Sequence, residues 1–212
     1  METIFLYILA ALSAVYLASL FFKRGIFQSI AKACLMPLVL AIYISGSDSI
    51  FIPVVLALFF GWLGDIFLLK IEDARFFKLG LAVFLLGHLF YIPTLLFFSG
   101  GINVKVLLIS LPAGAALGVF LHYLIRPSSE MNILTIIYEA ILLLMVLSAV
   151  QLFAAKGSPY GALALAGGLC FIASDTVLAI FTFRTKPRYG DFLVMLTYIS
   201  AQLLIILGLS GV

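Results

Sequence analysis

Eight runs of mostly apolar residues follow one another along the chain, each about 20 residues long. A helix needs about this length to cross the hydrocarbon layer of a bilayer. Charged residues, glycines and prolines separate the runs. The second run is interrupted by Lys32 and Pro37, so the alternative there is a re-entrant or surface segment, which leaves seven spans. We expect membrane-spanning helices over residues 3–22, 26–45, 50–69, 76–98, 104–125, 131–153, 159–183 and 189–209.

The composition is typical of an integral membrane protein. Of the 212 residues, 65 % are hydrophobic and 10 % are charged, whereas soluble domains are about half apolar and a quarter charged. The polar stretches are short connections, so we expect a single all-α, polytopic membrane domain over residues 1–212. The first run lacks a small-residue cleavage site followed by a soluble domain, which favours a mature span over a signal peptide. Cys34 and Cys170 lie in apolar runs. We therefore expect them to be small core residues rather than members of a disulfide or a metal site.

Lysine and arginine gather on alternate connections between the spans. The second, fourth and sixth connections hold only Lys105 and Lys156, and Lys32 lies inside a span. By the positive-inside rule, the odd connections are cytoplasmic and both termini lie on the opposite side. Short connections without long tails suggest a bacterial inner membrane. The odd connections hold Lys23, Arg24, Lys70, Arg75, Lys78, Arg126, Arg184, Lys186 and Arg188.

Two aspartates lie inside these apolar runs, Asp65 and Asp175. A charge at such depth costs a few kcal/mol, so it indicates function by default. The two positions are 110 residues apart, since 175 minus 65 is 110, and the same offset relates Gly80 to Gly190. One interpretation is a parallel internal repeat in which spans 3–4 resemble spans 7–8. The alternative is chance matching between apolar segments.

The polar residues of the spans share one half of the membrane. At about 1.5 Å per helical residue, they lie between the cytoplasmic ends of the spans and just past the midplane. We therefore expect one polar chamber in the cytoplasmic half, with the outer half closed by aliphatic and Phe packing. The residues concerned are Lys32, Asp65, His88, Tyr138, Glu139, Asp175, Tyr198 and Gln202.

The two aspartates allow a structural and a chemical interpretation. In the structural one, each carboxylate pairs with Lys32 or an aromatic hydroxyl and holds the helices together. In the chemical one, the low dielectric favours the neutral form of a carboxyl, so one keeps a proton to donate while the other is ionised. Two carboxyls in these states are the minimum for hydrolysis by a paired acid and base.

Aromatic and amide residues accompany the aspartates at helical spacing. His88 and Tyr91 share a helix face, as do Tyr198 and Gln202. Tyr138 and Glu139 are adjacent and point about 100 degrees apart. We therefore assign Tyr138 to the chamber and keep Glu139 as a candidate third acid.

Two basic residues near the spans have simple alternatives. Lys32 either snorkels to the cytoplasmic interface, or serves a substrate phosphate or an aspartate as counter-ion. His122 has the position of an interfacial residue without a function.

Motifs for several other chemistries are missing from the sequence. Two distant histidines without a clustered carboxylate or cysteine pattern argue against a zinc hydrolase. The sequence has no Gly-x-Ser-x-Gly elbow and no phosphate loop. Basic patches with interleaved aromatics are also missing, so nucleic acid is not expected as a partner, and neither a metal nor a cofactor is expected.

Four motifs together resemble the YhhN family of eight-span membrane proteins, over nearly the whole chain. One departure is Ala33 after Lys32, where the family pattern is expected to have proline. Members include lysoplasmalogenases, which hydrolyse the vinyl ether bond of lysoplasmalogens to a fatty aldehyde and glycerophospho-ethanolamine or -choline. The motifs are Gly64-Asp65-x-x-Leu68; Gly80-x-x-x-Phe84-x-x-x-His88-x-x-Tyr91; Phe171-Ile172-x-Ser174-Asp175-x-x-Leu178-Ala179; and Tyr198-x-x-x-Gln202-Leu203.

The resemblance implies a metal-independent ether hydrolase acting on a lysophospholipid among membrane lipids. Asp65 and Asp175 would be catalytic, with the deeper Asp175 as acid and the ionised carboxylate stabilising the cation and activating water. The substrate-binding residues would be Lys32, His88, Tyr91, Tyr138, Ser174, Tyr198 and Gln202.

Two other functions stay open at this point. In a small proton-coupled transporter or lipid-binding receptor, the same carboxylates would carry protons or bind a cation; inverted repeats and broken helices would favour transport. The third interpretation is a purely structural membrane protein. The sequence says nothing of the oligomeric state.

Overall fold

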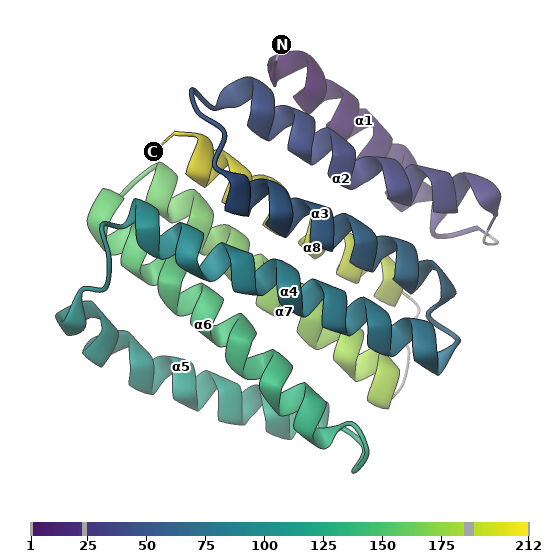
Figure 1. Cartoon of the computed structure of the whole chain (residues 1–212). Helices are drawn as coiled ribbons and strands as arrows, with labels where there is room; N and C mark the ends of the chain where they lie inside the picture. The colour runs from purple at the N-terminus through teal and green to yellow at the C-terminus, as the bar shows by residue number, and fades with distance from the viewer. Residues whose placement is uncertain (1, 23–24, 185–188, 212) are drawn as a thin grey trace. The chain divides into compact units, whose positions relative to one another are not determined.

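A computed structural model describes residues 2–22, 25–184 and 189–211, and all the regular secondary structure within these ranges is helical. The observed bounds agree with the expected spans to within a few residues. Lys23, Arg24, Lys186 and Arg188, which entered the charge count, lie outside the described residues. The helices are α1 (Glu2–Ser19), α2 (Ile26–Gly46), α3 (Ile52–Phe67), the short 3₁₀ helix η1 (Leu68–Lys70), α4 (Ala74–Phe98), α5 (Val104–Ile125), α6 (Asn132–Lys156), α7 (Tyr160–Phe183) and α8 (Gly190–Ser210) (Figure 1).

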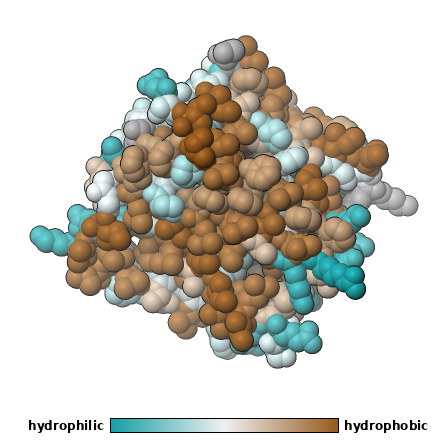
Figure 2. Space-filling model, in the orientation of Figure 1, coloured by the Kyte–Doolittle hydropathy of each residue, from teal (hydrophilic) through white to brown (hydrophobic). Residues whose placement is uncertain are grey.

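Eight of these helices are long and apolar enough to cross a membrane. The face in Figure 2 is mostly apolar, as expected of a surface that lies against lipid. The second span was the uncertain one in the sequence, and it forms the continuous helix α2 through both Lys32 and Pro37. The prediction of an all-α protein with eight spanning helices is therefore confirmed.

The chain divides into two compact units, Met1–Thr94 and Leu95–Ser210, and the boundary falls inside α4. In the first unit, α1 packs on α2 and α2 packs on α3 (Figure 1). Glycines allow α3 and α4 to approach closely, since a Cβ on Gly87 would lie 3.2 Å from the Ala57 carbonyl oxygen. The predictions of a single domain and of an internal repeat are not tested by this division and stay predictions.

In the second unit, α6 packs against both α5 and α7, and α7 packs along α8. The α5 helix begins at Asn103, whose side chain accepts hydrogen bonds from the amides of Lys105 and Val106 and so satisfies two donors of the first turn. The polar residue Gln151 of α6 bonds the same segment, donating to the Asn103 carbonyl and accepting from the Asn103 amide. These bonds hold the start of α5 against the end of α6.

The contact between α7 and α8 depends on small residues. A Cβ on Gly208 would lie 2.7 Å from both the Ala164 nitrogen and the Tyr160 carbonyl oxygen, and one on Gly167 would lie 2.8 Å from the Ala201 carbonyl oxygen. Small residues let helix backbones approach closely where lipid supplies no hydrophobic drive between helices. Glycine at these positions therefore sets the position of α7, which carries Asp175.

We predict that Gly208→Ala lowers the free energy of unfolding by about 1–3 kcal/mol, because the new methyl group overpacks against the α7 backbone. Chemical unfolding of the purified protein in detergent measures this change. The matched control is Gly25→Ala, since nothing lies within 4 Å of a Cβ at Gly25. Equal stability of the two variants would show that α7 and α8 are not closely packed at this point.

Candidate functional site

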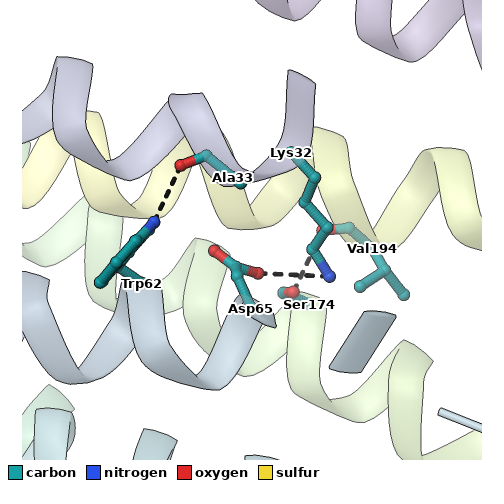
Figure 3. Close-up of polar contacts among 6 residues, drawn as sticks. All are labelled: Lys32, Ala33, Trp62, Asp65, Ser174 and Val194. Carbon is teal, nitrogen blue, oxygen red and sulfur yellow. Dashed lines mark hydrogen bonds and ion pairs between the residues drawn. The ribbon is translucent and has the colours of Figure 1, made fainter. Parts of the chain in front are cut away.

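Lys32 and Asp65 form a buried ion pair between α2 and α3 in the first unit. The lysine Nζ lies 3.3 Å from Asp65 Oδ1, and the side chains are 12 % and 3 % exposed. Three residues before Asp65, the Trp62 indole nitrogen donates to the Ala33 carbonyl oxygen at 2.9 Å (Figure 3). This second bond fixes the position of α3 along α2. Lys32 therefore serves as a counter-ion to Asp65 rather than only reaching toward the interface.

The neighbouring helix α4 approaches this ion pair because Gly64 has no side chain. A Cβ at Gly64 would lie 2.7 Å from the Phe84 ring. On α4, His88 and Tyr91 are both buried, and the His88 Nδ1 lies 2.7 Å from the Phe84 carbonyl oxygen. A carbonyl only accepts, so Nδ1 carries the hydrogen and donates it. In the neutral ring, Nε2 is then the acceptor.

In the second unit, the Tyr138 hydroxyl of α6 donates to Asp175 Oδ2 of α7 at 2.7 Å. The adjacent Ser174 is buried, and its hydroxyl donates to the Val194 carbonyl oxygen of α8 at 3.1 Å (Figure 3). Ser174 thus fastens α7 to α8 directly beside Asp175.

Two further predicted site residues lie buried on α8. Tyr198 packs edge-on against Phe171 of α7, with ring centroids 5.8 Å apart, and Gln202 is 1 % exposed. Both residues lie on α8, the helix that also carries Val194, and they are one turn apart. They belong to the core between α7 and α8.

A cavity of about 40 Å³ lies among α5, α6 and α7. Its polar lining comes from Thr135, Tyr138, Glu139, Asp175 and Thr176, and apolar side chains complete the wall. Asp175 lines this cavity and is of intermediate exposure.

Glu139 lines this cavity together with Tyr138, whereas the sequence favoured Tyr138 for the chamber and kept Glu139 as a candidate third acid. The cavity extends from α5 to α7 and is wide enough to include side chains pointing about 100 degrees apart. Tyr138 contacts Asp175, while Glu139 Oε2 lies 3.0 Å from His122 Nδ1 on α5. His122 was expected to be an interfacial residue without a function, and its contact with Glu139 leaves that prediction untested.

The His122–Glu139 contact had a weak signal in the sequence. A short connection between two spans makes them antiparallel neighbours, so polar residues near the end of one and the start of the next lie at similar depth. That argument places both side chains in one layer, but it does not fix the rotation of either helix.

The predicted site residues divide between the two units. Within each unit, the structure brings particular members into contact, as Lys32 with Asp65 and Tyr138 with Asp175. A single chamber that unites the two groups stays a prediction. The first unit holds Lys32, Asp65, His88 and Tyr91, and the second holds Tyr138, Ser174, Asp175, Tyr198 and Gln202.

Among the residues that the structure describes, no three His, Cys, Asp or Glu side chains gather as they would around a metal ion. The two buried acidic clusters instead use lysine, tyrosine and histidine as their partners.

The sequence model of the YhhN family matches residues 27–209, which is most of the chain. The matched range includes every residue predicted for the site. Comparison with curated proteins and with solved structures finds no match.

We predict that Lys32→Met destabilises the protein by about 3–5 kcal/mol, because it leaves the Asp65 carboxylate buried without its cation. The double variant Lys32→Met/Asp65→Asn should recover most of this loss, since it removes both charges. Chemical unfolding of the four proteins in detergent gives the double-mutant cycle. Additive losses in the two single variants would show that the ion pair contributes no coupling.

Proposed function

The chain belongs to the YhhN family, and from this membership we propose that it is a lysoplasmalogenase. The reaction is hydrolysis of the vinyl ether bond of a lysoplasmalogen, which yields a fatty aldehyde and glycerophospho-ethanolamine or -choline. The observation that carries the proposal is the Tyr138–Asp175 hydrogen bond at a small cavity, also lined by Glu139, within helices apolar enough to span a membrane. An intramembrane carboxyl suits a substrate whose reactive bond lies just inside the lipid interface.

The substrate class follows from the surroundings of the site. A lysolipid has one chain, which an apolar protein surface accommodates alongside lipid, and a head group that stays near the interface. The vinyl ether is the first bond of that chain, so it lies near the depth of Asp175. Lysophospholipid and membrane lipids are therefore the proposed partners.

Asp175 is the proposed acid. Its described hydrogen bond comes from a phenol, which is neutral at ordinary pH, whereas Asp65 has a lysine cation 3.3 Å away. Two carboxyls in such different environments differ in their tendency to hold a proton, as acid and base pairs in enzymes do. The cation beside Asp65 favours its ionised form, which suits the proposed role of stabilising positive charge.

The proposed reaction begins with proton transfer from Asp175 to the outer alkene carbon. The alkene electrons form the new C–H bond, and an ether lone pair stabilises the resulting oxocarbenium ion. Water adds to the oxocarbenium carbon and loses a proton, which gives a hemiacetal. Cleavage of the carbon–oxygen bond then releases the aldehyde, and the glycerol oxygen takes a proton. One water is consumed, and no oxidant or reductant is needed.

The remaining site residues are proposed to bind and orient the lysolipid. His88 offers Nε2 as an acceptor when neutral, because Nδ1 donates to Phe84. Tyr91, Tyr198 and Gln202 supply hydroxyl and amide groups. Ser174 holds the backbone that carries Asp175 through its bond to α8.

The first prediction from this function concerns the two aspartates. Purified protein in detergent with a chelator should release aldehyde from a lysoplasmalogen, and Asp65→Asn and Asp175→Asn should each lower kcat by about 100-fold or more, the usual contribution of a general acid or base. The matched control is Asp48→Asn, which removes a carboxylate from an exposed connection. All variants are first shown to unfold at a temperature close to that of the parent.

Several outcomes would count against this proposal. No aldehyde from a folded parent would exclude the reaction and favour transport or lipid binding by the same carboxylates. Loss of activity on adding chelator, restored by a metal ion, would exclude the metal-independent mechanism. Full activity in Asp65→Asn would remove Asp65 from the catalytic residues while leaving Asp175.

The second prediction concerns orientation. We propose that both termini lie outside the cytoplasm, because the cytoplasmic connections carry most of the lysine and arginine. A reporter active only outside the cytoplasm, fused to either terminus in a bacterial host, should be active. The same reporter placed in the connection between α3 and α4 should be inactive, and the opposite pattern would reverse the orientation.

A further inference from the structure

The cavity beside Asp175 is too small to hold a lipid chain or a head group. Its volume is about 40 Å³, and a water needs roughly 10–15 Å³ of the same kind of volume. By this measure, the cavity has room for about three or four water molecules. A water also needs polar partners, and Tyr138, Glu139 and Asp175 all line the wall.

One carboxyl oxygen in this region lacks a protein partner. Glu139 Oε2 lies 3.0 Å from His122 Nδ1, whereas Oε1 is buried and has no hydrogen-bond partner among the described residues. A buried acceptor left unsatisfied costs about 1–3 kcal/mol, and more when it is charged. A water molecule that reached this oxygen would satisfy it.

The groups around Glu139 come from three helices. His122 reaches it from α5, Tyr138 lies next to it on α6, and Asp175 lines the same cavity from α7. Thr135 does not compete for Glu139, because its hydroxyl donates to the Met131 carbonyl oxygen at 2.9 Å. The cavity wall therefore carries one carboxyl group from α6 and one from α7.

We propose that Glu139 is the base that activates the hydrolytic water, which the cavity holds beside Asp175, and that His122 is a positioning residue for Glu139. The inference rests on the proposed lysoplasmalogenase reaction and deepens it. It assigns water activation to Glu139 in place of Asp65, which keeps the role of stabilising the cation.

The proton transfers balance over one turnover. Asp175 gives its proton to the alkene carbon and becomes ionised. The water oxygen then bonds to the oxocarbenium carbon while its proton moves to Glu139. When the hemiacetal collapses, Asp175 takes the hydroxyl proton, the carbon–oxygen bond breaks, and Glu139 protonates the departing glycerol oxygen. Both carboxyls return to their starting states.

His122 acts on this step through geometry. Its ring holds Glu139 Oε2, which leaves Oε1 for water, and its side chain is 34 % exposed near the end of α5. A positively charged or donating group is favoured in the last turn of a helix. Removing the ring frees Glu139 to rotate away from the cavity.

A measurement without substrate tests the water site. Infrared difference spectra in ordinary and heavy-oxygen water identify bands from bound water. A bound-water band should be present in the parent, shifted in Glu139→Gln and in Asp175→Asn, and unchanged in Glu130→Gln, a matched control at an exposed residue. A band unaffected by both cavity variants, or no such band, would overturn the proposal.

Aldehyde release then tests the roles. Glu139→Gln keeps the shape and hydrogen bonding but accepts no proton, so kcat should fall by about 100-fold or more with little change in KM. His122→Leu should lower kcat about tenfold, and His122→Asn, which keeps a donor near the Nδ1 position, should restore most of it. Glu130→Gln should match the parent.

The outcomes separate the two proposals. Parent activity retained in Glu139→Gln would overturn the base assignment and leave the lysoplasmalogenase reaction in place. An inactive parent would end the proposed reaction, and with it the role of Glu139 as base; the spectra would then decide the water site alone. Equal losses in His122→Leu and His122→Asn, with KM also raised, would show that His122 is not a positioning residue.

Discussion

Apolar surroundings make every buried charge in this protein depend on a partner. A carboxylate away from bulk water is costly unless it is paired or hydrogen-bonded, and each of the three described here contacts a specific neighbour. Lys32 forms an ion pair with Asp65, Tyr138 donates a hydrogen bond to Asp175, and His122 contacts Glu139. The helices are positioned accordingly, since a rotation that broke one of these contacts would leave an ionisable group in an apolar environment.

The eight spans could be predicted closely because span length and apolar content are properties of single segments. Even α2 follows the prediction, since the helix continues through Lys32 and Pro37. The third span is the exception in detail: α3 ends at Phe67, and the residues from Leu68 form a 3₁₀ turn. The sequence has no strong signal for that tighter turn.

The site was harder to predict because it depends on how helices rotate against one another. Asp175 and Tyr138 were both expected among the polar residues, and they are in contact. The His122–Glu139 contact was not predicted, because each residue was weighed on its own helix and the angle between Tyr138 and Glu139 favoured only Tyr138 for the chamber. Sequence spacing gives the direction of a side chain, but not the width of the cavity that receives it.

The partners of these polar groups also share a pattern along the chain. Lys32 and Asp65 join α2 to α3, His122 and Glu139 join α5 to α6, and Tyr138 and Asp175 join α6 to α7. Each pair thus links helices that are consecutive in the chain. During synthesis, the partner of an ionisable group in one helix is therefore on the next helix to emerge. Insertion as hairpins therefore neutralises or satisfies each group early, before the rest of the chain has been made.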